Sequence, residues 1–214
     1  MKGNVKKLVT LAMLAAIAYL LVVTIRIPVV LFLKYEPKDV AVTIGGFLFD
    51  PLSAFLISLV VSLIEMVTIS DTGIIGAVMN LLSTCAFACT ASLIYKRDRS
   101  LRGAIWGLVT GSVVMVAVML LWNWLITPLY LGYPRQAVEA MLIPVFLPFN
   151  ALKAALNSLL TMALYKPLVT GLRKVGLLES RPETNQGSKV GMYLFMGALA
   201  VTCGLLLLVI KGIL

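Results

Sequence analysis

The chain has 214 residues, of which 61% are hydrophobic and only 13% are charged, and its net charge is +9. Soluble domains average roughly 45–50% apolar and about 25% charged residues, so this composition excludes a soluble enzyme domain, a disordered protein and a DNA-binding module. At about 20 residues for each membrane span, the length accommodates six or seven helices and no separate soluble domain.

The first predicted span covers residues 7–25. Its apolar run continues to Ile25 without a small-residue cleavage site, which indicates a retained helix rather than a secretory signal. Residues 26–38 then interrupt the pattern, because Pro28 and Pro37 exclude a helix through them. The side chains between the two prolines favour a strand, so we expect a strand or an extended cap here.

The apolar segment 39–67 is predicted to form two helices. As one helix it would measure about 43 Å, well beyond the ~30 Å hydrocarbon core. The Asp50–Pro51 pair inside it is typical of a helix end followed by a new start. We therefore expect a short helix at 40–49 and a full span at 52–67. The remaining spans are expected at 74–95, 102–126, 145–165 and 190–213.

Lys and Arg residues gather in three short segments, namely the N-terminus, residues 96–102 and residues 166–189. Such clusters are typical of cytoplasmic loops, and they contain no aromatic residues that would indicate a nucleic-acid partner. All three fall on one side of the membrane only if 39–67 is split. The pattern therefore predicts a multi-pass protein of the cell membrane with a cytoplasmic N-terminus, an external C-terminus and an outer loop at 127–144.

The best candidate binding face lies in the sequence FNALKAALN at 149–157. Asn150, Lys153 and Asn157 share one helical face because they are spaced i, i+3, i+7. Such groups are costly in lipid and indicate a site or a helix contact. Two amides and an ammonium group suit a planar heterocycle with several acceptors. The alternative is hydrogen bonding between helices, with Lys153 reaching outward to the interface.

Two further amides are candidates. Asn123 lies between Trp122 and Trp124 at the outer end of its span, where the tryptophans are typical of an interfacial belt but an amide is not. We expect Asn123 to point towards the 150–157 face. Asn80 is a second candidate for a buried amide.

Acidic side chains give a weaker signal. Glu65 and Asp71 are expected at a solvated rim near the outer end of the 52–67 span, and Asp50 is expected to cap a cytoplasmic turn. The chain has no His, and Cys85 and Cys89 alone make a poor metal site, so we expect no metal, no cofactor and no catalytic residues. With no ATP-binding loop either, a transporter of this kind takes its energy from a partner.

The first span carries a small-residue face formed by Ala12, Ala15 and Ala16. Small residues allow close approach of another helix in lipid, either within the protein or from a partner.

Several segments resemble the substrate-binding S components of energy-coupling factor (ECF) transporters, and in particular their riboflavin-specific members. They are the small-residue helix, LKYEPKD at 33–39, GGFLFDPLSA at 45–54, NWLITPLY at 123–130 and FNALKAALNSLLTMALYK at 149–166. The resemblance implies a six-helix, all-α membrane core over about residues 1–170, with an external pocket that binds riboflavin as an unchanged substrate. It also implies an EcfT subunit and two EcfA-type ATPases as partners.

Site residues follow from the same resemblance. Asn150 and Lys153 match residues that meet the isoalloxazine ring, and Asn123 matches a further amide contact. The loop that caps the ligand contains Leu33, Lys34 and Tyr35. Ala12 and Ala16 match the surface that docks on EcfT.

The chain departs from this family pattern after the core. Residues 171–189 are expected to be a cytoplasmic linker, and 190–214 an additional transmembrane helix. A thiamine- or pterin-specific S component fits the same donors. An interfacial membrane enzyme and a purely structural subunit are further alternatives, disfavoured by the missing catalytic groups and by the deep lysine.

Overall fold

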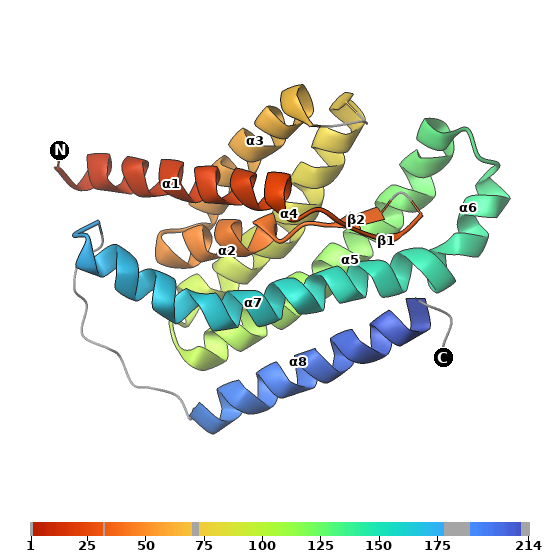
Figure 1. Cartoon of the computed structure of the whole chain (residues 1–214). Coiled ribbons are helices and arrows are strands. Elements are labelled where there is room, and N and C mark those ends of the chain that lie inside the picture. Colours follow the sequence, from red (N-terminus) through yellow and green to blue (C-terminus); the bar gives the residue numbers. More distant parts are fainter. Residues whose placement is uncertain (1, 32, 70–72, 178–188, 211–214) are drawn as a thin grey trace.

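The computed structural model describes residues 2–31, 33–69, 73–177 and 189–210, and nearly all of them are helical (Figure 1). In chain order the elements are α1 (Lys2–Thr24), β1 (Ile27–Val30), β2 (Leu33–Tyr35), α2 (Lys38–Leu48), α3 (Pro51–Thr68), α4 (Gly73–Arg97), α5 (Leu101–Leu131), α6 (Arg135–Met141), the π-helix η1 (Leu142–Phe146), α7 (Leu147–Lys174) and α8 (Lys189–Ile210). Within the described residues, six helical segments are long and apolar enough to cross a membrane. The predicted helical membrane fold is confirmed.

Helix α2 is too short to cross the membrane. Its 11 residues extend only about 17 Å, and ten of them are buried inside the bundle. The break after it lies where the sequence predicts it. The side chain of Asp50 accepts a hydrogen bond from the Ser53 N–H (2.7 Å), and Pro51 occupies the first turn of α3. Burial raises the pKa of Asp50, but hydrogen bonds from Lys7 and Ser53 outweigh that effect and lower it.

The basic segments lie together at one end of the bundle. Lys6 Nζ donates to the carbonyl of Gly176 (2.9 Å), which joins the start of α1 to the end of α7. The Tyr95 and Tyr165 hydroxyls are 3.1 Å apart, which joins the end of α4 to the C-terminal half of α7. The expectation that the three cation-rich segments share one side is therefore met by the described residues. Residues 178–188 of the expected linker lie outside them.

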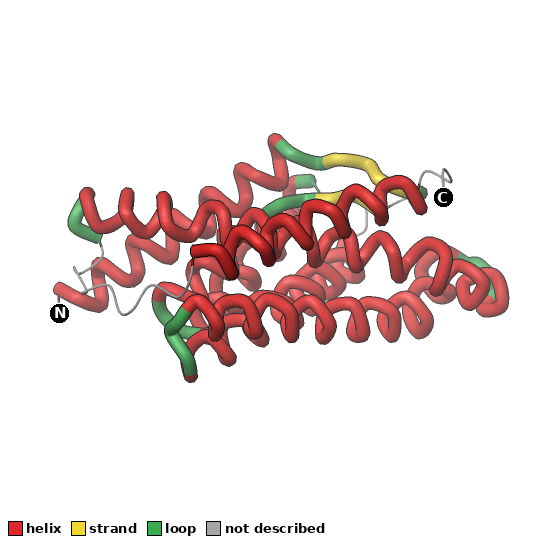
Figure 2. Tube along the Cα trace, turned by 90° about the horizontal axis from the view of Figure 1, so that it is seen from below, coloured by secondary structure: helices red, strands yellow, loops and turns green. Residues whose placement is uncertain are grey.

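The opposite end carries the predicted strand segment, which is a two-stranded antiparallel hairpin (Figures 1 and 2). Ile27 pairs with Tyr35, and Pro28 with Lys34. Leu33 of β2 packs into a cluster with Val138 of α6. The hairpin thus lies across this end of the bundle, against the segment that leads into α7.

The prediction of an outer loop at 127–144 is wrong in detail, because most of these residues are helical. Helix α5 runs through Pro128 to Leu131 and ends at Gly132, whose φ of 67° is in the left-handed region. Helix α6 and η1 then lead directly into α7, which passes through Pro167 and continues to Lys174. Prolines that mark loops in soluble proteins are tolerated in transmembrane helices, because neighbouring groups satisfy the freed backbone.

Close packing of α4 against α5 brings two walls of the bundle together. A Cβ atom at Gly107 would lie 2.6 Å from the carbonyl oxygen of Ala91, and one at Gly111 would lie 2.6 Å from that of Phe87. These glycines are therefore required by the close approach of the two helices.

Helix α8 packs mainly along α7, and it ends at the hairpin end of the bundle (Figure 2). The residues that face the protein recur about every 3.5 positions: Met192, Phe195, Met196, Leu199, Cys203, Leu206 and Ile210. Such a spacing is typical of two helices that pack side by side at a shallow angle. The remaining faces of α8 are exposed.

Candidate ligand-binding site

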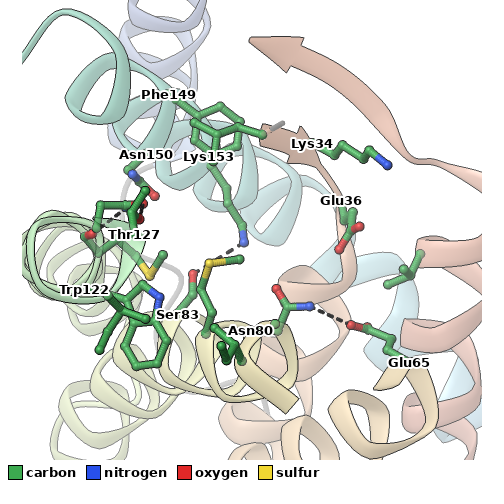
Figure 3. A pocket seen from close by; sticks show the side chains of 18 of the residues that line it. Lys34, Glu36, Glu65, Asn80, Ser83, Trp122, Thr127, Phe149, Asn150 and Lys153 are labelled. Atoms are coloured by element: carbon green, nitrogen blue, oxygen red, sulfur yellow. Dashed lines mark hydrogen bonds between the residues drawn. The ribbon is translucent and has the colours of Figure 1, made fainter. Parts of the chain in front are cut away.

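A cavity of about 320 Å³ lies at the hairpin end of the bundle (Figure 3). It is bounded by α3, α4, α5 and α7 and covered by the hairpin. The lining residues are Val22, Arg26, Leu33, Lys34, Glu36, Glu65, Ile69, Ile75, Gly76, Met79, Asn80, Ser83, Met119, Trp122, Asn123, Ile126, Thr127, Phe149, Asn150 and Lys153.

The α7 wall presents Phe149, Asn150 and Lys153. Asn150 lies in the first turn of α7, one turn after the π-helix that ends at Phe146, and π-helical turns are frequent near functional sites. Its Nδ2 donates to the Phe146 carbonyl (2.8 Å), which uses one of its two N–H groups. Lys153 Nζ lies 3.4 Å from both the Ser83 hydroxyl and the Asp39 carboxylate. In Figure 3 the ammonium group extends into the centre of the cavity.

The facing walls carry the other two predicted amides. Asn123 of α5 is 1% exposed, donates to the Met119 carbonyl (2.7 Å) and accepts from the Thr127 hydroxyl (2.9 Å). Asn80 of α4 donates to the Glu65 carboxylate (2.9 Å). Each amide NH₂ therefore has a second N–H that no described residue accepts, since the amide carries two donors.

A chain of ion pairs supplies Arg26, Glu36 and Glu65 to the remaining polar wall, with Lys38 buried behind them. Lys38 Nζ lies 2.7 and 2.6 Å from the two carboxylate oxygens of Glu65 and 3.7 Å from Glu36. Arg26 Nε donates to Glu36 (2.9 Å). Two cations and two carboxylates thus balance each other, which is the condition for burying such groups.

The expectation of a solvated rim at Glu65 is wrong. Glu65 is 3% exposed, because the Lys38 ammonium and the Asn80 amide replace water around its carboxylate. Asp71, the other member of the expected rim, lies outside the described residues. Glu36, Lys38 and Asp39 are buried as well, which was not predicted from the sequence.

A signal for these three was present in the sequence. The run EPKD at 36–39 places three charges directly before an apolar helix, where a solvated loop would not need alternating signs.

Six of the eight residues predicted to meet a ligand line the cavity, and two lie behind it. Tyr35 and Asn157 are absent from the lining. The Tyr35 hydroxyl instead donates to Asn157 Oδ1 (3.0 Å), and Asn157 Nδ2 donates to Asp39 (2.9 Å). Burial raises the pKa of Tyr35, so its phenol keeps the proton that it donates. The cavity geometry gives no support to direct ligand contact by these two residues.

The three residues of the small-residue face of α1 lie in different environments. Ala12 and Ala16 are exposed on the outside of the bundle, whereas Ala15 packs against the core. Leu14 and Ala18 supply the buried side of the helix instead. Packing inside the protein thus does not account for Ala12 and Ala16.

The arrangement suits reversible binding of a flat, largely apolar ligand. Met79, Trp122 and Phe149 offer apolar walls, and the amides of Asn123 and Asn150 offer directed donors. Pockets of this kind, apolar with a few fixed polar groups, are typical of sites for small organic molecules.

Residues 6–165 match the family model for "ECF transporter, substrate-specific component". The chain is 29% identical to the "Riboflavin transporter RibU" of Staphylococcus aureus (strain TCH60), over 79% of this chain and 94% of the relative. It is 26% identical to the "Riboflavin transporter FmnP" of Bacillus subtilis (strain 168), over 70% of this chain and 85% of the relative.

A solved structure is also similar, that described as "Structure and mechanism of the S component of a bacterial ECF transporter". It has a TM-score of 0.67 and 30% sequence identity, and the match covers 79% of this chain and 99% of that chain. The family model ends at residue 165, so α8 lies beyond it.

Proposed function

The chain belongs to the family of substrate-specific components of ECF transporters, and from that premise we propose that it binds riboflavin and mediates its uptake. It is a multi-pass membrane protein and a substrate-binding component rather than an enzyme. Relatives named as riboflavin transporters support the choice of ligand. Riboflavin is bound as the transported substrate and undergoes no chemical change.

The observation that carries the proposal is the cavity with its donors. The isoalloxazine ring of riboflavin is flat and carries two carbonyl oxygens and ring nitrogens as acceptors. The second N–H groups of Asn123 and Asn150 and the Lys153 ammonium match such acceptors. The hydroxyl groups of the ribityl chain suit the charged wall formed by Arg26 and Glu36, because a hydroxyl both donates and accepts.

The direct test is a titration that measures quenching of flavin fluorescence by the purified protein. Asn150→Ala should weaken riboflavin binding about 5- to 150-fold, because a ligand acceptor would be left buried without a donor, at a cost of about 1–3 kcal/mol. Lys166→Ala, an exposed change on the same helix, is the control and should leave affinity unchanged. Thiamine and a pterin, titrated in competition, should not displace riboflavin. Wild-type protein that binds one of them and not riboflavin would overturn the choice of ligand.

Uptake further requires a partner, which we infer to be EcfT together with two EcfA-type ATPases. Ala12 and Ala16 are available for close approach of a partner helix. Ala12→Trp should abolish riboflavin uptake by cells while leaving binding by the purified protein intact. A parallel loss of both would show that this face of α1 has another role.

The orientation follows from charge. The end of the bundle that carries Lys6, Arg97 and Lys166 faces the cytoplasm by the positive-inside rule, so the cavity and the hairpin face outward. A cysteine introduced at Ser100 in intact cells should therefore be protected from an impermeant reagent. One introduced at Leu31 of the hairpin turn, which is exposed, should react.

A further inference from the structure

Asp39 is the most completely buried acidic group of the described chain, with 0% exposure. It lies in the first turn of α2, and its carboxylate accepts hydrogen bonds from two other helices. Oδ1 accepts from the Thr84 hydroxyl of α4 (2.6 Å). Oδ2 accepts from the Asn157 amide of α7 (2.9 Å) and lies 3.4 Å from Lys153 Nζ. Asp39 itself is not part of the cavity lining.

Lys153 depends on this carboxylate. A lysine has a flexible stem, so the position of its ammonium group is set by its partners. Among the residues that the structure describes, the partners of Lys153 are Asp39, at ion-pair distance, and the Ser83 hydroxyl at 3.4 Å, which is a long hydrogen bond. The charge that faces the cavity is therefore held from behind by Asp39.

The same carboxylate is linked to the hairpin. Asn157 donates to Asp39 with its amide nitrogen, and its oxygen accepts from the hydroxyl of Tyr35 in β2 (3.0 Å). Tyr35 is buried, and its neighbours Leu33 and Lys34 line the cavity. A hairpin that lifts away from the cavity breaks the bond between Tyr35 and Asn157.

We propose that Asp39 is a positioning residue of the binding site, which orients Lys153 towards the ligand and, through Asn157 and Tyr35, ties closure of the hairpin to that orientation. The proposal rests on the proposed function and names residues that act on the ligand without touching it. The Asp39–Lys153 contact is the first arm of this arrangement, and the link from Asp39 through Asn157 to Tyr35 is the second. Since both arms end on one carboxylate, ligand contact at Lys153 and closure of the hairpin stabilise each other. Such reciprocity is required of any two events that share a coupling free energy.

A double-mutant cycle tests the first arm, with the full-length protein in detergent. Asp39→Asn keeps the shape and loses the charge, and Lys153→Met keeps the stem and loses the ammonium. Each should weaken riboflavin binding about tenfold or more, since a charge-assisted hydrogen bond is lost. In the Lys153→Met background, Asp39→Asn should change affinity less than about twofold, because the amide oxygen left at position 39 can still accept from Asn157 and so keeps the link to the hairpin. Losses that multiply would overturn the proposal, because Asp39 would then act independently of Lys153. Asp98→Asn, an exposed change at the other end, is the matched control.

The melting temperatures of the ligand-free variants give a readout that does not depend on riboflavin. Each single change leaves one buried group without its partner, whereas the double change leaves neither charge. The double variant should therefore melt above the less stable single variant, and a melting temperature below both overturns the pairing. If wild-type protein binds no riboflavin, the proposed function fails, and this ligand-free cycle still decides whether Asp39 positions Lys153.

Tyr35→Phe tests the second arm, because it keeps the ring and removes only the hydroxyl. The hairpin should open more readily, so riboflavin should dissociate about threefold faster or more, with little change in the association rate. Tyr193→Phe on the exposed side of α8 is the control and should change neither rate. An unchanged dissociation rate in Tyr35→Phe would overturn the link between the hairpin and Asp39.

Discussion

Helices α2 and α8 are both apolar in sequence, yet they occupy opposite environments. Helix α2 is half the length of a membrane span and is buried at ten of its 11 residues. Helix α8 is long enough to cross the membrane, and only 6% of its most apolar stretch is buried. Lipid can therefore cover every face of α8 except the one against the bundle, whereas α2 is surrounded by protein.

The difference shows which helices hold the binding site together. Helix α2 begins with Lys38 and Asp39, whose partners lie in α3, α4 and α7. Helix α8 places only apolar side chains against α7, and apolar contacts gain little in lipid, which is as apolar as they are. Changes in α2 should thus cost stability and binding, and comparable changes in α8 should not.

The largest effect is expected for Lys38→Met. The buried Glu65 carboxylate would then lose its cationic partner among the described residues, and Glu36 would keep only Arg26. Removal of one partner from a buried ion pair typically costs about 3–5 kcal/mol in the free energy of unfolding. Thermal unfolding in detergent measures the loss. Lys96→Met, which removes an exposed cation, is the control, and equal stability of the two variants would show that α2 does not depend on its charges.

A smaller loss is expected for Gly46→Val in the middle of α2. A Cβ atom there would overlap the Ser92 hydroxyl and lie 3.0 Å from the Ala54 Cβ, so the helices would have to separate. Overpacking of this kind costs about 1–3 kcal/mol. Gly197→Val in α8 is the matched change, because nothing lies within 4 Å of that position. Equal shifts of the unfolding curves of the two variants would show that α2 is no more tightly packed than α8.

The smallest effect is expected when the chain is ended after Leu177, which removes α8. Riboflavin affinity should stay within about threefold of the full-length value, because lipid or detergent takes the place of α8 along α7. The same fluorescence titration measures it. A large loss of affinity would contradict this expectation. It would show that α8 supports the hairpin through the cluster that contains Val29.

Features that depend on local chemistry could be predicted from the sequence. The Asp50–Pro51 break follows from a proline, a capping side chain and a segment too long for one span. Asn150 and Lys153 could be placed on one face because the helical period alone decides that. Neither inference needs any knowledge of the partner helices.

Features that depend on depth and on partners could not be predicted. Asn157 shares the face of Asn150 but lies about 10.5 Å further along the axis, so it falls behind the cavity. Glu65 can be buried because Lys38, 27 residues earlier in the chain, pairs with its carboxylate. The helical path through Pro128 was missed because the same residues in a soluble protein would mark a loop.

The short length of α2 also has a consequence for biogenesis. An 11-residue helix that carries a lysine and an aspartate does not meet the requirement of about 20 apolar residues for membrane insertion on its own. Its polar partners, Thr84 and Asn157 among them, are synthesised later. Helix α2 can therefore be fully covered only after α7 has been made, and the cavity is completed late in synthesis. A nascent chain stopped after Leu131 should accordingly leave a cysteine at Val40 open to a water-soluble reagent that cannot reach it in the finished protein.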